Sequence, residues 1–465
     1  MPSIEGLYLR CPVWVQELAC DAHGRQLRNL RYGGNYSRIL ADAEQRSTWP
    51  QERIEEFRDR RLRAFILHAV ETVPFYRRRF LELGIDAREI RTLADIVRLP
   101  VLEKAEVQDQ TQAFVSEGVP ASAQIVAHTS GTTGAGLRFR VTKEAVREQW
   151  AVWWRYRRWH GLHFGLKCGT FAGRSIVPLS QTQAPFWRTS KPLCQILFSG
   201  YHMSPANMAA YVEALRRNRP PWLHGYPSLL ALLAAYIHEK RLELGYQLQW
   251  VTVGAENLLE QQASIIHRAF GVQPKQHYGM AEAVANFSEC ERGQLHVDED
   301  FAAVEFLARG DGSTYRVVGT NFSNPAMPLI RYDVGDVVSL SDSPCLCGRP
   351  GRIVHSVDGR NEDYIVLRDG AKIGRLDHIF KDLTDIREAQ ILQRRIGEVT
   401  LRVVRGPHYT RDDERRLLLA TRQRLGTTVD VQIEYFEELP RSSTGKLRFV
   451  ISDLEEGKLE VVKSE

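Results

Sequence analysis

A short segment rich in glycine and hydroxyl side chains, Thr129 to Gly134, places the strongest constraint on the fold. It reads T-S-G-T-T-G and follows an apolar run at residues 125–127. From Leu137 to Val141 apolar residues alternate with polar ones, a pattern that indicates a strand. The segment is therefore predicted to be a loop between two strands. Its glycines, hydroxyls and closely spaced backbone N–H groups suit an anion, most of all a polyphosphate.

Two familiar phosphate-binding loops do not fit this segment. A P-loop requires Gly-Lys-Ser/Thr at the start of a helix, whereas Gly134 is followed by Ala135, Gly136 and a strand pattern. A dinucleotide-binding loop requires G-x-G-x-x-G opening a helix, and neither the spacing nor the context agrees. Taken alone, the segment is also compatible with an ordinary polar hairpin turn.

The composition limits the class of protein. A chain of 465 residues is expected to form two or more domains. Its 62 Lys and Arg against 57 Asp and Glu give a net charge of +5, which offers no argument for nucleic acid. The longest apolar run, Leu229 to Ile237, is too short to span a membrane. We expect a soluble cytoplasmic protein acting on small molecules, with the oligomeric state open and a dimer among the options.

The order of strand and helix patterns predicts an α/β fold. Between Leu223 and Glu282 strands and helices alternate, and Gly225, Gly254 and Gly279 each follow a predicted strand. Ligands bind beyond the carboxyl ends of strands in such sheets. The last hundred residues read as a compact α+β unit that ends in a Gly- and Ser-containing loop carrying Lys446.

A tryptophan-rich helix is predicted from Lys143 to His160. Its four tryptophans lie among several arginines. We expect a core stripe of tryptophans with the arginines on the solvent face. A platform for a cofactor or an aromatic substrate is the alternative.

Three cysteines and one histidine form a candidate metal site. Cys290 and His296 are separated by five residues, and Cys345 and Cys347 follow about fifty residues later. Three thiolates and one imidazole are a closed tetrahedral set typical of structural zinc (Zn²⁺). The alternative is that these are reduced, packed cysteines.

Seven motifs, in chain order, resemble the core motifs of adenylate-forming ligases. The motif sequences are similar to those of the phenylacetate-CoA ligase family, in its CapK-like and coenzyme F390 synthetase-like branch, and the resemblance covers nearly the whole chain. The resemblance implies a large N-terminal adenylation domain with mixed sheets (residues 1–362, with a helical collar at 1–120). It also implies a small mobile α+β domain at 363–465, with the hinge at Asp363. The motifs are T-S-G-T-T-G, H-G-Y-P-S, G-A-E, H-Y-G-M-A-E, I-R-Y-D-V-G-D, D-G-R-N-E-D-Y and P-R-S-S-T-G-K.

The resemblance also assigns roles to individual residues. Glu282 is implied as the Mg²⁺ ligand, Asp336 as the acceptor of the ribose hydroxyls, and Lys446 as the lysine of the adenylation step. Arg360 is implied to contact ribose or phosphate. The β- and γ-phosphates of ATP would be held by Thr129, Ser130, Gly131, Thr132, Thr133 and Gly134, and the adenine side of the site would be formed by Gly254, Ala255, Glu256, Tyr278 and Gly279.

The chemistry of these residue types agrees with the implied roles. Attack of a carboxylate on the α-phosphate brings two anions together, so it needs Mg²⁺ and a cation such as Lys446. A lysine on a mobile domain suits two-step chemistry. We therefore expect an ATP-dependent ligase that forms an acyl-adenylate and passes the acyl group to coenzyme A. The carboxylate pocket is expected around residues 225–227, the Gly254 turn, His277 and the tryptophan-rich helix.

Two alternatives remain open at this point. One is an amide-forming or AMP-transferring enzyme of surface-polysaccharide or cofactor metabolism. The other, from a different class, is a non-catalytic nucleotide-binding protein. The sequence also departs from the family's pattern, because Ala135 and Gly136 stand where Lys-Pro is usual and Ala281 precedes the acidic end of Y-G-x-x-E. These departures bear on how the phosphates are held.

Overall fold

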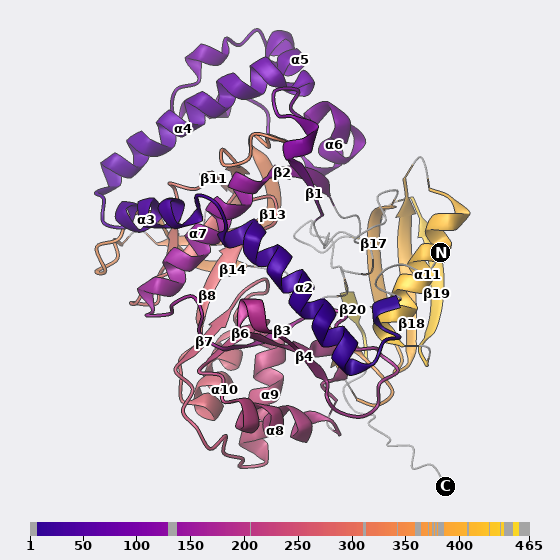
Figure 1. Ribbon diagram of the computed structural model, residues 1–465. Coiled ribbons are helices and arrows are strands. Elements are labelled where there is room, and N and C mark those ends of the chain that lie inside the picture. The colour runs from indigo at the N-terminus through magenta and orange to yellow at the C-terminus, as the bar shows by residue number, and fades with distance from the viewer. Residues whose placement is uncertain are drawn as a thin grey trace.

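The structure is a computed structural model in which a twelve-stranded sheet lies beside a smaller four-stranded sheet (Figure 1). It is a mixed α/β fold with a separate C-terminal domain, as the sequence predicts. The described residues are 7–128, 137–204, 206–309, 313–341, 343–358, 364–370, 372–373, 376, 379, 386–406, 409–426, 428–437, 439–440 and 450–454.

Helices form most of the first 120 residues. Two of these helices are separated at Val73, which is extended because the residue before proline avoids the helical region, and Pro74 opens the next helix. Their apolar faces bury a common core that includes Leu62, Phe65 and Phe75. The helices are α2 (Val13–Tyr32), α3 (Tyr36–Arg46), α4 (Gln51–Thr72), α5 (Pro74–Leu83) and α6 (Lys104–Asp109).

The two strands predicted on either side of the glycine-rich loop are present. β1 (Gln124–His128) pairs antiparallel with β2 (Arg138–Thr142), and His128 lies opposite Arg138. Leu137 and Phe139 are buried against the core of the N-terminal helices. The hairpin is therefore fixed on the collar, and α7 (Lys143–Trp159) starts directly after it with the Thr142 hydroxyl accepting from the Ala145 N–H.

Half of the large sheet is parallel and is covered on both faces. Helices α8 (Met208–Asn218), α9 (Pro227–Glu239) and α10 (Glu260–Phe270) pack on one face, and α3 and α7 on the other. Because side chains alternate along a strand, Phe171 and Leu223 face α8–α10 whereas Cys168 and Trp222 face α7. The strands are β3 (Cys168–Ala172), β5 (Gln195–Ser199), β6 (Trp222–Gly225), β7 (Trp250–Val253) and β8 (Lys275–Gly279), with β4 (Trp187–Ser190) antiparallel at the edge.

From β8 onward the same sheet continues antiparallel. The strand order is β11-β12-β13-β14-β10-β9-β8, so the chain leaves the parallel half at β8. The strands are β9 (Asn286–Glu289), β10 (Leu295–Val297), β11 (Ala303–Ala308), β12 (Tyr315–Thr320), β13 (Tyr332–Ser341) and β14 (Ile353–Asp358).

The C-terminal sheet has the order β19-β18-β17-β20 and buries its own core with α11. It contacts the rest of the molecule where the Arg424 guanidinium donates to the Ser175 hydroxyl (2.6 Å) and to the Tyr201 hydroxyl (2.8 Å). Its elements are α11 (Arg411–Leu425), β17 (Ile386–Gln393), β18 (Glu398–Arg405), β19 (Asp430–Phe436) and β20 (Val450–Ser452), preceded by β15 (Ile365–Val366) and β16 (Lys372–Ile373).

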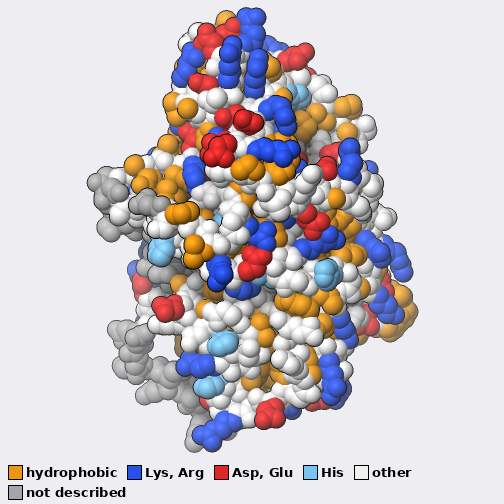
Figure 2. Space-filling model, turned by 90° about the vertical axis from the view of Figure 1, so that its left-hand side faces the viewer, with side chains coloured by type: hydrophobic (Ala, Val, Ile, Leu, Met, Phe, Trp, Pro, Cys, Tyr) orange, Lys and Arg blue, Asp and Glu red, His pale blue; other side chains and the backbone are white. Residues whose placement is uncertain are grey.

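The surface carries charges of both signs. Figure 2 shows lysines and arginines interspersed with acidic side chains on the face that it presents. Within the residues that the structure describes, no helix combines the length and apolar character needed to cross a bilayer.

Candidate active site at the strand ends

A cavity of about 210 Å³ lies at the carboxyl ends of β3, β6, β7 and β8. Gly225, Gly254 and Gly279, each at the end of a strand, line it together with His277. This is the edge at which parallel sheets bind ligands. The residues expected around a carboxylate pocket therefore share one cavity.

Two of these glycines are required by close packing. A Cβ on Gly225 would lie 2.1 Å from the Phe171 carbonyl oxygen, and one on Gly254 would lie 2.8 Å from Cε1 of His277. Real Cβ contacts are not that short, so side chains at these positions would push the strands and the ring apart. Because glycine has no Cβ, the strand ends and the His277 ring can approach each other closely at the cavity.

Helix α7 supplies an aromatic wall. Trp150, Trp153 and Trp154 line the cavity, and the Trp153 indole N–H donates to Oδ1 of Asn286 (2.9 Å). The platform interpretation thus fits three of the four tryptophans. Trp159 is not among the lining residues, and the Arg349 guanidinium lies 4.2 Å from its ring centroid.

The expectation that the arginines of α7 lie on its solvent face is wrong for two of them. Arg155 is 3% exposed and Arg157 is 4% exposed. The reason is that α7 is enclosed by α2 and α3 on one side and by the sheet on the other. A helix enclosed in this way has no wide solvent face, and its charged residues then depend on partners from neighbouring elements.

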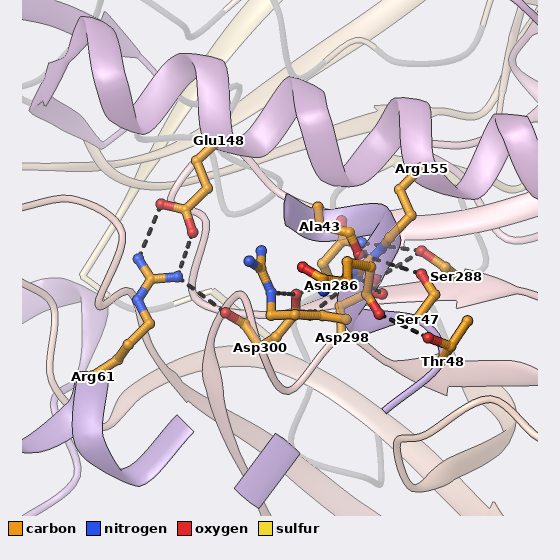
Figure 3. A network of polar contacts seen from close by, with 12 residues as sticks. Ala43, Ser47, Thr48, Arg61, Glu148, Arg155, Asn286, Ser288, Asp298 and Asp300 are labelled. Atoms are coloured by element: carbon orange, nitrogen blue, oxygen red, sulfur yellow. Dashed lines mark hydrogen bonds and ion pairs between the residues drawn. The ribbon is translucent and has the colours of Figure 1, made fainter. Parts of the chain in front are cut away.

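Arg155 finds its partners in the segment after β10 (Figure 3). Its guanidinium donates to Asp298 (2.5 Å) and to both carboxylate oxygens of Asp300 (2.7 and 3.1 Å), and Arg46 adds a bond to Asp300 (2.6 Å). Burial alone would raise the pKa of Asp300, but Arg155 and Arg46 outweigh it and hold that pKa well below its usual range. Burial prevails at Asp298, whose pKa is raised. The network ties α3 and α7 to the sheet.

Two histidines of the cavity are uncharged at neutral pH. Burial, aided by the charge of Arg157, lowers the pKa of His277 to about 3. The same causes in the same order place the pKa of His224 well below its ordinary value. Both imidazoles therefore act as neutral hydrogen-bonding groups, and the formal positive charge in the cavity comes from arginine.

Two residues that the resemblance assigns to the nucleotide contact each other. The Tyr278 hydroxyl donates to Oδ2 of Asp336 (2.7 Å), although the two residues are 58 positions apart. The Tyr278 ring stacks on Phe287 with centroids 4.6 Å apart. The hydrogen bond fixes the orientation of the Asp336 carboxylate.

Glu256 and Glu282 belong to turns that follow β7 and β8. The Glu256 carboxylate accepts from the backbone N–H of Ser228 (3.2 Å) at the start of α9, which suits an anion at a helix N-terminus. The half-buried Glu282 has its backbone carbonyl held by the side-chain amide of Asn321 (3.1 Å). Both turns are therefore anchored by hydrogen bonds to other elements.

Two charged residues of the I-R-Y-D-V-G-D motif, Arg331 and Asp333, have structural partners. Arg331 forms a buried two-pronged ion pair with Glu305 (2.7 to 3.1 Å) and also donates to the carbonyl of Val97 (3.2 Å). Asp333 pairs with Arg316 and accepts from the Gly335 N–H (2.8 Å). These two residues join the sheet to the N-terminal helices, and the role of Asp336 stays a prediction.

Several predicted site residues lie outside the described residues. They are Thr129, Ser130, Gly131, Thr132, Thr133, Gly134, Arg360 and Lys446, together with the predicted hinge at Asp363. Their roles stay predictions. Sequence reasoning, in turn, did not single out Arg31, Arg157 or Arg174, which all line the cavity. Arginines interleaved with the tryptophans of α7 were the available signal for Arg157.

The predicted metal-site residues come together between β9, β10 and the segment before β14. The ligand atoms of Cys290, His296, Cys345 and Cys347 all lie within 4.8 Å of one another. The sulfurs of Cys290 and Cys345 are 3.6 Å apart, and the Cys347 sulfur is 3.3 Å from Nε2 of His296. The other ring nitrogen of His296 donates to the Pro350 carbonyl (2.9 Å), so Nε2 offers its lone pair to the cluster.

These distances match a closed tetrahedral set. Zinc–sulfur bonds of about 2.3 Å place two thiolates roughly 3.8 Å apart, and a zinc–nitrogen bond of about 2.0 Å places the nitrogen roughly 3.5 Å from a sulfur. None of the three cysteines forms a disulfide bond, so all three thiols are available as ligands. The donor set therefore fits a structural zinc ion.

Comparison with known proteins gives consistent results. The family model described as the CapK C-terminal domain matches residues 365–453. Protein CapK of Staphylococcus aureus is 24% identical over 96% of this chain and 99% of its own length. Phenylacetate-coenzyme A ligase of Thermus thermophilus is 26% identical, with 87% of this chain and 97% of that protein covered.

Solved structures agree on the fold. 2-Hydroxyisobutyryl-CoA ligase in complex with 2-HIB-AMP and CoA superposes with a TM-score of 0.56 at 22% identity, covering 88% of this chain and 92% of that one. The same enzyme in its postadenylation state gives a TM-score of 0.55. The chain is thus a homologue of CapK and of the phenylacetate-CoA ligases, with a CapK C-terminal domain and the fold of the adenylate-forming CoA ligases.

Proposed function

We propose that this protein is an ATP-dependent carboxylate ligase that forms an acyl-adenylate and then transfers the acyl group to coenzyme A. The observation that carries the proposal is the Tyr278–Asp336 pair, whose tyrosine lies in the chain between His277 and Gly279, two lining residues of the cavity at the carboxyl ends of the parallel strands. Its relatives with phenylacetate-CoA ligase activity in their names support the same reaction class.

The residues at the strand ends suit a nucleotide. Asp336 would accept from the ribose hydroxyls, and Tyr278 holds one of its oxygens in a fixed orientation. Gly254 and Gly279 leave room where a Cβ would meet His277 or the side chain of Asn286, at 2.8 and 2.6 Å. The glycine-rich loop Thr129–Gly134 would hold phosphate oxygens. Its two flanking strands support this role because they fix both ends of the loop on the collar.

Glu282 would hold Mg²⁺, because hard carboxylate oxygens are its preferred ligands. Bound Mg²⁺ supplies positive charge that offsets the negative charge of the phosphates. The contribution of this chain is to fix the turn: Asn321 holds the Glu282 carbonyl, so the carboxylate projects from an anchored backbone. Arg360 would contact the ribose or a phosphate.

Lys446 would stabilise the charge that develops on the α-phosphate during adenylation. We assign it to a mobile domain of residues 363–465, with the hinge at Asp363 and the adenylation domain at residues 1–362. The contact of Arg424 with Ser175 and Tyr201 supports one docked position of that domain, held by few polar bonds. Leaving that position after adenylation would admit the thiol of coenzyme A.

The first test is release of pyrophosphate from ATP and Mg²⁺ across a panel of aryl, fatty and amino acids, with and without coenzyme A. Release with one class of acid, followed by thioester formation on addition of coenzyme A, is expected. Lys446→Ala should suppress adenylate formation far more than thioester formation from supplied acyl-adenylate. Equal loss of both steps would contradict the two-step role of this lysine.

The CapK C-terminal match favours a second candidate. In it the adenylated acid is passed to an amine, or AMP is transferred to an acceptor, in surface-polysaccharide or cofactor metabolism. The same assay separates the two candidates: pyrophosphate release that coenzyme A leaves unchanged but an amine increases would favour the second. Silence with every acid, despite ATP binding, would point to AMP transfer.

We also propose that Cys290, His296, Cys345 and Cys347 hold one structural zinc ion, in a protein of the reducing cytoplasm. The site joins β9 and β10 to the segment before β14, and it would stabilise this half of the sheet without taking part in catalysis. Metal analysis of the purified protein by mass spectrometry tests this. About one zinc per chain is expected, and a metal-free protein with four free cysteine or histidine ligands would refute it.

A further inference from the structure

The cavity at the strand ends is lined by arginines without matching acids. Arg31, Arg157 and Arg174 contribute side chains, and no aspartate or glutamate is among its described lining residues. Arg174 is exposed and Arg31 is half-buried, whereas Arg157 is only 4% exposed. The described walls therefore carry an excess of positive charge, greatest where the solvent is most excluded.

The neighbours of Arg157 on α7 show how unusual its surroundings are. Arg155 is paired with Asp298 and Asp300, and Arg158 with Glu44. Arg157 has no carboxylate partner among the described residues, and its buried Nε has no hydrogen-bond acceptor. A buried charge is costly unless it is paired, so this guanidinium calls for an anion that the described part of the chain does not supply.

Aromatic rings hold Arg157 in place. Its guanidinium carbon lies 5.2 Å from the ring centroid of Trp154, 5.3 Å from that of Trp222 and 5.9 Å from that of Trp150. Cation–π contacts offset part of the cost of burial, but they leave the buried Nε without an acceptor. All three tryptophans also line the cavity. The arginine is therefore oriented by rigid groups and ready to bind a planar anion.

Resting on the function proposed above, we infer that the acid activated by this protein carries a second anionic group, which pairs with Arg157 inside the aromatic cavity. One carboxylate of the substrate would face the Gly254 and Gly279 side, next to the Tyr278–Asp336 pair. The other would accept two hydrogen bonds from the guanidinium in the fork geometry that arginine forms with carboxylates.

The volume of the cavity limits the size of this acid. About 210 Å³ leaves room for a small diacid between the aromatic walls. The aromatic walls favour a flat substrate. An acid with a methyl group in place of the second carboxylate would leave Arg157 buried and unpaired. Sites built to bond a polar group reject such analogues by up to about 10⁴-fold.

Matched pairs of acids test this inference by ATP–pyrophosphate exchange. The pairs are 4-carboxyphenylacetate with 4-methylphenylacetate, and glutarate with pentanoate. We expect kcat/KM to favour the diacid of at least one pair by about 100-fold or more. Arg157→Met keeps the volume but removes the charge, and it should abolish that preference by weakening the diacid alone. Arg158→Met, on the exposed neighbour paired with Glu44, should leave the preference unchanged.

Two further measurements keep the outcome decisive. Arg157→Lys retains the charge without the fork, so an intermediate preference is expected. This variant replaces Arg157→Met if the latter does not fold. Isothermal titration calorimetry with the same diacids measures binding without turnover. A wild-type preference for the monocarboxylic acids of the pairs would overturn the inference and leave the ligase function standing. No exchange with any acid would overturn the ligase function, and calorimetry would then decide the inference: diacid binding lost in Arg157→Met supports it, and no binding refutes it.

Discussion

The buried network around Asp300 leads to a sharp prediction about stability. Asp300 accepts bonds of 2.6 Å from Arg46 and of 2.7 and 3.1 Å from Arg155, and it is 3% exposed. In Asp300→Asn the side chain keeps one acceptor oxygen, and its new NH₂ group faces an arginine N–H. Arg46 also loses the carboxylate it pairs with. Removing one member of a buried ion pair costs about 3–5 kcal/mol.

The control is Glu44→Gln, which breaks the ion pair of Glu44 with Arg158. The side chains of this pair are 33% and 37% exposed, and such pairs contribute roughly 0–1 kcal/mol. Urea unfolding followed by tryptophan fluorescence suits the comparison, because all nine tryptophans precede residue 251 and report on the larger part of the chain. With a slope of about 3 kcal/mol/M, the midpoint of Asp300→Asn should fall by about 1 M or more.

The pH dependence provides a second check on the same variant. Because the pKa of Asp300 is lower in the folded protein, its stabilisation is fully present above the unfolded value of about 3.9 and is lost as the pH falls through the folded value. The difference in unfolding free energy between wild type and Asp300→Asn should therefore be constant near neutral pH and shrink below about pH 4. A midpoint shift no larger than that of Glu44→Gln would refute the reasoning, since the two arginines would then have found other acceptors.

The remaining predictions concern the site and the metal cluster. Tyr278→Phe removes the hydroxyl that orients Asp336, so the KM for ATP should rise by about 10-fold while the KM for the acid stays the same, measured by pyrophosphate exchange. Gly225→Ala places a Cβ 2.1 Å from the Phe171 carbonyl oxygen and should lower the melting temperature and the activity together; a fully active variant would contradict this packing. Cys347→Ser should lower the zinc content from about one per chain to near zero, whereas Cys194→Ser, outside the cluster, should retain the metal.

Much of the fold could be predicted from the sequence because local patterns and tertiary packing agree there. The apolar run before the glycine-rich loop and the alternation after it predicted the β1–β2 hairpin. The strand-end glycines fell at the cavity because parallel strands align their carboxyl ends. In each case a short-range signal was sufficient.

The environment of α7 could not be predicted in this way. Tryptophans and arginines are interleaved along it, so periodicity does not say which arginine is solvated. The acids that bury Arg155 lie more than 140 positions away, at Asp298 and Asp300. Pairing at such separation depends on the sheet order, which one sequence does not specify. For the same reason, one sequence does not show that the described residues place no acid against Arg157.

The contrast between Arg155 and Arg157 links the stability of this protein to its proposed specificity. The first arginine is paired with two carboxylates of the chain, and these bonds hold α7 against the sheet. With α7 held in place, the indole of Trp153 can bond to Asn286, and Asn286 in turn donates to Asp298 (2.5 Å). The cavity wall and the ion-pair network are therefore one connected structure. The acids of the network already pair with arginines of the chain, whereas Arg157, held in the wall by tryptophans, has no carboxylate partner among the described residues. Weakening the network should thus loosen the preference for a diacid before it abolishes folding, and Asp300→Asn at moderate urea concentration is the variant in which both effects can be measured together.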